Sequence, residues 1–203
     1  MVFLNDSLFA VLLGDWNKLF IQPDWVSTNV FQSEEMEIRI RGVGTDCEVS
    51  YACNDVIITP AQDKLVFGVS FNSDDRLQYF ADCINRFVQE ASSPVKGAFG
   101  INCDFYEEDG LVFAEVSDGI SDHDTLVKDG YQICATTLSR TLEKGNKVIN
   151  IDFKMNNTGL NIHFNEHHEE GLNKQLNADD FKAFINECDS ILTTLGYSLE
   201  REE

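Results

Sequence analysis

Three of the four histidines of this chain fall between residues 163 and 168, interleaved with glutamates in the segment NIHFNEHHEEGL, residues 161–172. Imidazole and carboxylate groups together form the ligand set of catalytic zinc and manganese centres. In such a centre the metal ion binds a water molecule at an open coordination position and lowers the pKa of that water. The water then serves as the nucleophile of a metal-dependent hydrolase. The candidate metal ligands are His163, His167 and Glu170.

The strand expected around these histidines argues against a shared metal ion. Ile162 and Phe164 alternate with His163 and Asn165, so we expect the apolar pair to face a helix-covered core and the polar pair to face away. Along an extended strand His163 and His167 would lie about 13 Å apart, too far for ligands placed about 2.1 Å from one ion. Metal binding would require the chain to bend back.

An exposed acidic loop is the prediction that we favour for the residues that follow. Residues 166–177, with the sequence EHHEEGLNKQLN, separate this strand from the next expected helix. The loop would place Glu166, Glu169 and Glu170 at the surface. Carboxylates there would contact a basic partner.

Other stretches contain reactive residue types without the spacing that their chemistry needs. Asp118, Asp122, Asp124 and Asp129 surround His123, but the ligand register of a calcium loop is missing. The glycines of RGVGTD join two strands instead of opening a helix. The sequence contains no GxSxG, HExxH or Walker lysine motif. We therefore expect no enzymatic activity.

The cysteines indicate a reducing compartment, because none forms a CxxC pair and several occupy apolar positions of expected elements. A secreted disulfide framework would be denser, in a shorter chain. A catalytic pairing such as Cys103 with His163 is the open alternative. The six cysteines are Cys47, Cys53, Cys83, Cys103, Cys134 and Cys188.

The charge of the chain restricts its partners. With 15 basic and 35 acidic residues, the net charge is −20. Such a surface repels nucleic acid and anionic lipid and favours a basic protein partner, although acidity also serves solubility alone. The apolar run of MVFLNDSLFAVLLGDW lacks a preceding basic region, which predicts a strand and not a signal peptide. We expect a cytoplasmic protein with no cofactor and no membrane segment.

Two long amphipathic helices are predicted. Residues 73–91 begin at Ser73, a favourable N-cap, and two aspartates follow it in the first turn. Residues 177–197 begin at Asn177 in the same way and end at Gly196. Each helix carries its apolar residues on one side, so each should pack on a sheet.

The remaining periodicity predicts strands. Residues 36–41 alternate Met36, Ile38 and Ile40 with charged residues, the pattern of a half-buried strand. Further strands before Pro94 precede the first helix, and a similar series precedes the second. We expect a single α+β unit over 1–203, with pseudo-halves 1–93 and 94–203 of the form β-α-β(3–4)-α. Its long, curved antiparallel sheet would carry both long helices on one face, in a saddle-like or helix-grip-like arrangement.

One segment resembles a known family. Residues 92–109, SSPVKGAFGINCDFYEED, are similar to the TPV…G-I-N-x-x-F stretch of uncharacterised, sporadically distributed bacterial proteins often carried on mobile elements. Ser93 stands where the family usually has threonine. The family has no agreed activity, so the resemblance implies no catalytic residues.

The central residues of that motif also allow a structural interpretation. Gly100 within a strand suggests a bulge or a close approach of another backbone, and Asn102 would satisfy peptide groups freed there. Phe105 is the aromatic residue of the motif.

Together these observations predict a non-enzymatic acidic binding protein that engages a basic protein partner, as an immunity, inhibitor or defence-associated factor does. A helix-grip cavity for a small apolar ligand, lined by some of the 15 phenylalanines, is the alternative. A metal-dependent hydrolase built on the histidines is a third and less favoured hypothesis.

Overall fold

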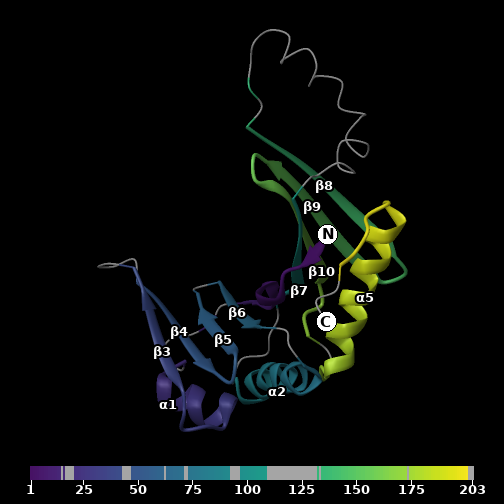
Figure 1. The fold of residues 1–203 in the computed structure, drawn as a ribbon. Coiled ribbons are helices and arrows are strands. Elements are labelled where there is room, and N and C mark those ends of the chain that lie inside the picture. The colour runs from purple at the N-terminus through teal and green to yellow at the C-terminus, as the bar shows by residue number, and fades with distance from the viewer. Residues whose placement is uncertain are drawn as a thin grey trace. The chain divides into compact units, whose positions relative to one another are not determined.

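The computed structural model describes every residue except 15, 17–20, 43–46, 62, 71–72, 92–96, 109–131, 133, 173 and 201–203. Within the described residues the fold is α+β with a large antiparallel sheet of ten strands, which confirms the predicted class (Figure 1). Neighbouring strands follow the order β3-β4-β5-β6-β2-β7-β10-β9-β8, and β1 pairs with β7.

The elements follow one another in the order β1 (Val2–Phe3), η1 (Asn5–Ser7), β2 (Leu8–Leu13), α1 (Pro23–Trp25), η2 (Val26–Phe31), β3 (Glu37–Arg41), β4 (Glu48–Cys53), β5 (Val56–Pro60), β6 (Lys64–Val69), α2 (Asp74–Glu90), β7 (Phe99–Glu107), β8 (Ala135–Lys144), β9 (Lys147–Asn156), β10 (Gly159–His168) and α5 (Ala178–Thr194). α1 begins at Pro23, and proline is favoured at the first position of a helix. No helix in the described part of the chain has both the length and the apolar character needed to cross a membrane.

The chain divides into two compact units. Unit 1 comprises Met1–Leu4, Cys103–Asn165 and Ile185–Glu203, and unit 2 comprises Asn5–Asn102 and Glu166–Phe184. These boundaries differ from those of the predicted halves, because β7, β10 and α5 each begin in one unit and end in the other.

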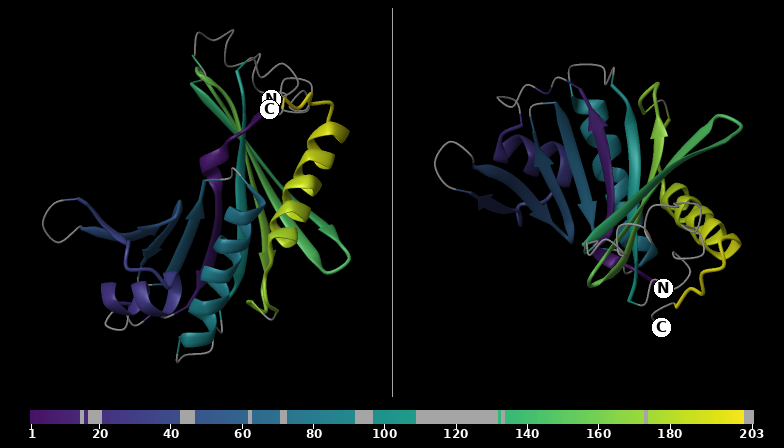
Figure 2. Two further views of the ribbon diagram at one scale, coloured as in Figure 1. Left: turned by 60° about the horizontal axis from the view of Figure 1, so that its bottom comes forward. Right: turned by 90° about the horizontal axis from the view of Figure 1, so that it is seen from above.

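The core of unit 2 lies between α2 and the sheet (Figure 2). Buried Phe67 of β6 and Phe87 of α2 meet edge to face, with ring centroids 5.7 Å apart. Trp16 and Trp25 contact Phe87 in the same manner, at 5.2 and 5.6 Å. Edge-to-face contacts are the favoured geometry of aromatic pairs, so Phe87 anchors the helix to the sheet.

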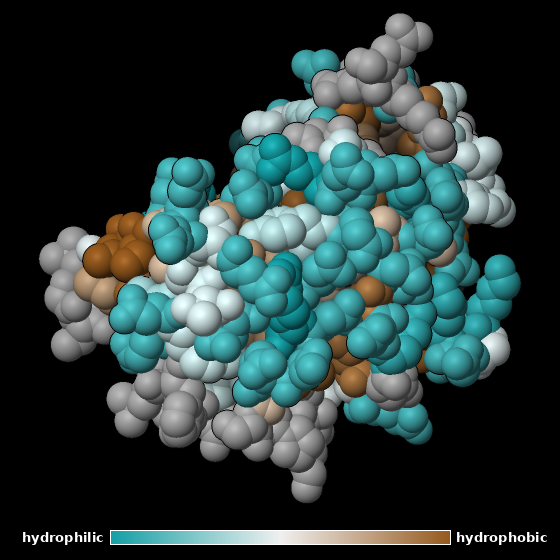
Figure 3. Space-filling view, turned by 90° about the horizontal axis from the view of Figure 1, so that it is seen from below, coloured by the Kyte–Doolittle hydropathy of each residue, from teal (hydrophilic) through white to brown (hydrophobic). Residues whose placement is uncertain are grey.

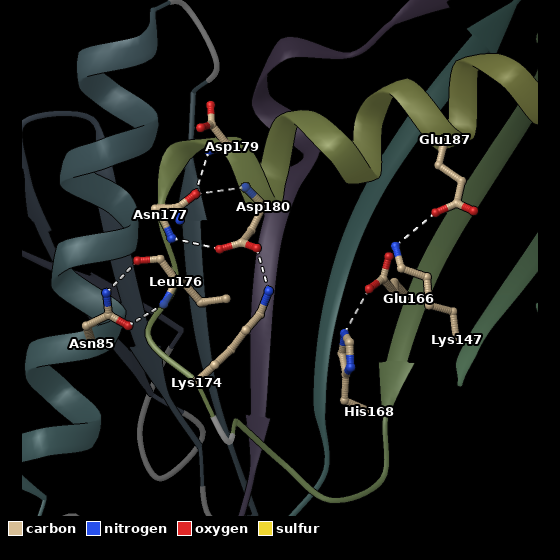
Figure 4. Close-up of polar contacts among 10 residues, drawn as sticks. All are labelled: Asn85, Lys147, Glu166, His168, Lys174, Leu176, Asn177, Asp179, Asp180 and Glu187. Carbon is tan, nitrogen blue, oxygen red and sulfur yellow. Dashed lines mark hydrogen bonds and ion pairs between the residues drawn. The ribbon is translucent and has the colours of Figure 1, made fainter. Parts of the chain in front are cut away.

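The start of α5 is fixed to α2 by polar and apolar contacts. Asn85 donates from Nδ2 to the Leu176 carbonyl at 2.7 Å and accepts the Leu176 amide at 2.9 Å (Figure 4). This side-chain amide therefore bonds both backbone groups of one residue, as a neighbouring strand would. Beside it, the rings of Phe80 and Phe181 lie 4.8 Å apart.

The core of unit 1 is built from β7, β9, β10 and β1. Phe105 of β7 packs edge-on against Phe3 and Phe164, at centroid distances of 5.4 and 5.6 Å. β8 and β9 form a hairpin of ten residue pairs, from Ala135↔Asn156 to Lys144↔Lys147. At its tip Gly145 has a φ of 65°, the left-handed conformation that favours glycine in a two-residue turn.

The strand predicted to be half-buried is exposed along its whole length. All five residues of β3 are exposed, and Ile38 and Ile40 retain 50% and 67% of their accessible surface. β3 lies at one end of the strand order, with a neighbouring strand on one side only. Alternation in a sequence identifies a strand but does not show that anything covers its apolar face.

Both predicted N-caps of the long helices are confirmed. Ser73 Oγ accepts the Arg76 amide at 3.4 Å at the start of α2. Asn177 Oδ1 accepts the amides of Asp179 and Asp180 at 2.9 and 3.2 Å, and the Asp180 carboxylate accepts the Asn177 amide at 2.9 Å (Figure 4). This reciprocal arrangement is a capping box that satisfies donors at the first turn.

Replacement of Asn177 by alanine should lower the free energy of unfolding by about 1 kcal/mol, because two amides lose their acceptor. Urea unfolding followed by circular dichroism measures the change. Gln175→Ala, at an exposed position just before the helix, is the matched control and should change stability little. Equal effects of the two substitutions would contradict the role of the cap.

Candidate functional site

The histidine segment belongs to a strand and not to a loop. β10 continues to His168, so the predicted loop from residue 166 is wrong at its start. Burial alternates along the strand: Ile162, Phe164 and Glu166 are buried on one face, whereas His163 is only partly covered on the other. The predicted orientation of His163 is thus confirmed, and the strand extends further than its polar sequence suggests.

The candidate metal ligands are not brought together. Among the described residues, no group of three His, Cys, Asp or Glu side chains is placed so that it could hold a metal ion. His163 and His167 lie four residues apart in β10, and Glu170 follows the end of the strand. The geometry therefore gives the metal-centre hypothesis no support from this set.

His163 makes a short contact with a carboxylate of unit 1. Its Nδ1 lies 2.7 Å from Asp104 Oδ1, and both side chains are about one third exposed. A carboxylate in this position fixes the orientation of the imidazole ring, as it does for an acid–base histidine. A general-base site contains such a pair, but it also needs a nucleophile within reach of the ring.

Cys103 does not supply that nucleophile. Cys103 precedes Asp104 in β7, so its side chain faces the opposite side of the sheet from His163. Its Sγ lies instead 3.9 Å from Sγ of Cys188 in α5, and both residues are fully buried. The alternative of a Cys103–His163 pair is therefore wrong.

Hydrogen-bonded amides extend the polar face that carries His163. Asn165, two residues further along β10, accepts a hydrogen bond from Asn150 of β9 at 3.2 Å. Asn150 in turn accepts a hydrogen bond from the Thr141 hydroxyl of β8 at 2.8 Å. Cross-strand pairs of this kind stabilise a sheet, and each group is used by its neighbour. These hydrogen bonds give the three polar side chains a structural role in the sheet.

Glu166 is buried in unit 2 and is used internally. It retains 5% of its accessible surface, and its Oε1 lies 3.0 Å from Nε2 of His168 (Figure 4). The His168 ring stacks on Phe99, with centroids 5.6 Å apart. Glu166 is therefore poorly placed to contact a partner, whereas Glu169 and Glu170 are exposed as predicted.

Glu166→Ala should destabilise the protein by roughly 1–3 kcal/mol, because it removes the partner of His168 and leaves a gap on the buried face of β10. Thermal and urea unfolding measure the loss. Glu169→Ala, three residues away and exposed, removes the same charge and should change stability by less than about 0.5 kcal/mol. A larger loss of stability with Glu169→Ala than with Glu166→Ala would contradict the role of the buried Glu166 in stabilising the fold.

The described part of the family-like motif spans the two units and has no bulge at Gly100. Gly100 pairs with Val11 and Asn102 with Phe9 in an uninterrupted β2–β7 register, so the bulge interpretation of Gly100 is wrong. Asn102 Nδ2 does reach a backbone group, since it donates to the Phe9 carbonyl at 3.5 Å. Phe105 lies in the core of unit 1.

A groove in unit 2 is the concave feature that sequence patterns did not indicate. It has a volume of about 670 Å³. It is formed where β3, the β4–β5 turn, the end of β6 and the start of α2 meet. The turn at its rim places Asn54 and Asp55 at φ values of 48° and 64°, the left-handed pair of a tight hairpin. The lining comprises Glu35, Met36, Glu37, Arg39, Ala52, Cys53, Asn54, Asp55, Ile57, Ser70 and Arg76.

The charges of the groove are largely paired along its walls. Arg76 Nη1 lies 2.8 Å from Asp55 Oδ2, and Arg39 Nη2 lies 3.0 Å from Glu37 Oε2. Glu35, which is exposed, leaves the lining with an excess of one carboxylate. Both ion pairs are solvent-exposed, and exposed pairs are weak. Each pair therefore contributes little to stability.

Burial makes a thiol of unit 2 unreactive. Cys83 is fully buried in α2, and this burial raises the pKa of its thiol to about 12 from an ordinary 9.0. The nearby Arg86 guanidinium acts in the opposite direction without reversing the effect. The attacking species is the thiolate, so Cys83 is a core residue and not a nucleophile.

Alkylation of the folded protein with iodoacetamide at pH 8 should modify the exposed Cys134 well before Cys83. At that pH a thiol with a pKa of about 12 forms about a thousandfold fewer thiolates than one at 9.0. Peptide mass spectrometry over time measures both sites. Alkylation in urea is the control and should remove the difference; equal rates in the folded protein would contradict the burial of Cys83.

No family model and no curated protein matches the sequence. The resemblance of residues 92–109 to a bacterial family therefore stays a prediction, and residues 92–96 and 109 of that segment lie outside the described part of the chain. The aspartates around His123 and the end of the RGVGTD turn also lie outside it.

Proposed function

We propose that this chain is a non-enzymatic, acidic binding protein that engages a basic protein partner, as an immunity protein, an inhibitor or a defence-associated factor does. The observation that supports this proposal most strongly is the groove of unit 2. It is a concave site with one carboxylate in excess, on a chain whose net charge is −20. A concave surface buries more of a bound side chain than a flat one does.

The groove combines apolar and acidic groups in a way that suits lysine and arginine. Met36 and Ile57 provide apolar surface for the methylene stem of a long basic side chain. Glu35, Glu37 and Asp55 provide carboxylates for its charged end. A guanidinium group can take two carboxylate oxygens at once, which favours arginine over lysine.

Carboxylates outside the groove extend the attraction. Glu169 and Glu170 are exposed after β10, and Asp74 and Asp179 are exposed at the first turns of α2 and α5. Lys182 lies 2.6 Å from Asp74 and 3.7 Å from Asp179, and the hydrogen bond with Asp74 raises its pKa. An excess of negative charge over the whole chain accelerates encounter with a basic protein.

Two further predictions belong to this proposal. We infer that the chain works in the cytoplasm, as a member of the bacterial family that residues 92–109 resemble. We also infer that its fold consists of two β-α-β(3–4)-α halves, with both long helices on one face of a curved saddle-like or helix-grip-like sheet. The series of strands before each of α2 and α5 supports the second inference.

The groove favours this function over the apolar-ligand alternative. Most of its lining is polar or charged, whereas large phenylalanines such as Phe67, Phe80 and Phe181 are fully buried and contact other rings. These rings fill the core. The metal-dependent hydrolase has no comparable observation in its favour.

Capture of partners from the native host by the immobilised protein, at low and at high salt, tests the proposal. We expect a basic protein that is retained at low salt and lost at high salt, because charge attraction is screened. Glu35→Lys should reduce its recovery about tenfold, because it places a like charge in the groove. Glu90→Lys, at the exposed end of α2, is the matched control and should reduce it less.

Three results would overturn the proposal. The first is recovery of no protein at either salt concentration. The second is recovery of an acidic protein. The third is equal loss of the partner with the groove variant and the control variant, which would assign the attraction to net charge and not to the groove.

A further inference from the structure

The outer edge of β3 carries exposed apolar residues on an otherwise hydrophilic surface. β3 pairs with β4 on one side and ends the strand order, so no described strand occupies its other side. Ile38 and Ile40 are among the few large apolar side chains that are more than one third exposed in the described residues. Figure 3 shows an apolar patch at this end of a face that is largely hydrophilic.

Edge strands usually carry features that prevent pairing with another chain, such as charged residues, proline or short length. β3 has charged residues at alternate positions but also has five regular residues without proline or a bulge. The isoleucines are not protective, because β-branched residues stabilise strand pairs. This edge is therefore suited to a partner strand whose charges match its own.

The sequence of β3 is its own antiparallel complement. When two copies of Glu37–Arg41 are aligned antiparallel about Arg39, Glu37 of each copy stands opposite Arg41 of the other. In the same register Ile38 of each copy stands opposite Ile40. Opposite charges and β-branched pairs directly across a strand pair are both stabilising. We propose that two copies of this chain pair through β3 in this register, which joins their sheets edge to edge.

The central pair is the unfavourable part of this register. Arg39 stands opposite its own copy, and like charges in that position repel. The structure supplies a partial remedy, because Arg39 is paired with Glu37 of its own strand at 3.0 Å. β3 itself carries two arginines and one glutamate, so it is a locally basic edge on a chain of net charge −20. Two acidic molecules therefore approach one another most easily at this edge.

The interface is small, since it consists mainly of two five-residue strands. Interfaces of this size form transient complexes, so the dimer should dissociate in the micromolar range or above. Moderate salt should strengthen it, because salt screens the long-range repulsion between two acidic molecules more than it weakens contacts at close range. This dependence is opposite in sign to that expected for a basic partner.

Sedimentation equilibrium from about 1 µM to about 1 mM protein, the range of weak interfaces, tests the dimer. Glu37→Arg places arginine opposite arginine, and Arg41→Glu places glutamate opposite glutamate, so each variant alone should weaken the dimer about tenfold or more. An equimolar mixture of the two variants restores both cross-strand ion pairs and should dimerise more tightly than either variant alone. The doubly exchanged chain should also recover.

Circular dichroism of each variant is the control for folding. Misfolded chains would not regain dimerisation when they are mixed, so recovery in the mixture would also show that both variants are folded. A chain that stays monomeric at every concentration would overturn the proposal. So would dimerisation of both single variants with unchanged affinity, or a mixture that fails to recover. Glu35 lies outside β3, so Glu35→Lys, which should reduce capture of a basic partner about tenfold, should leave this dimer intact and separates the two proposals.

Discussion

β2 is paired on both sides, with β6 along its whole length and with β7 from Phe9 to Leu12. Its sequence is entirely apolar, and Leu8, Ala10 and Leu12 are fully buried. A slip of one residue would turn these three buried side chains to the other face of the sheet, so the register of β2 with both neighbours is strictly limited. Through these two registers β2 sets the position of the β3–β6 series and of β7 within unit 2. The groove and the β3 edge both depend on that placement.

The helices could be predicted from sequence because their signals are local. Ser73 and Asn177 act as caps within one turn of chain, and the apolar side of each helix repeats at fixed intervals. The general class of the fold follows from the same periodicity. Local signals of this kind do not depend on how the elements pack against one another. For this reason they predict the helices correctly.

Burial could not be predicted with the same success, because it depends on distant residues. Ile38 and Ile40 have the alternation of a covered strand and are exposed, whereas Glu166 has the charge of a loop residue and is buried beside His168. The residues that line the groove come from four separate stretches of the chain, so no single sequence motif indicates it. For the histidines, residue type indicated a metal site, but His163 and His167 lie four residues apart along β10, about 13 Å in an extended strand, which is too far for two ligands of one ion.

The division of the chain has a consequence for the order in which it can fold during synthesis. β1, at residues 2 and 3, pairs with Tyr106 and Phe105, and the same unit also requires residues from Ile185 onward. Its first and last segments are thus almost the whole chain apart, and contacts of such long sequence separation form slowly. Most of unit 2, in contrast, is complete once Asn102 has been made. During synthesis, most of unit 2 can therefore fold early, whereas β1 of unit 1 can pair only after the later residues of that unit have been made.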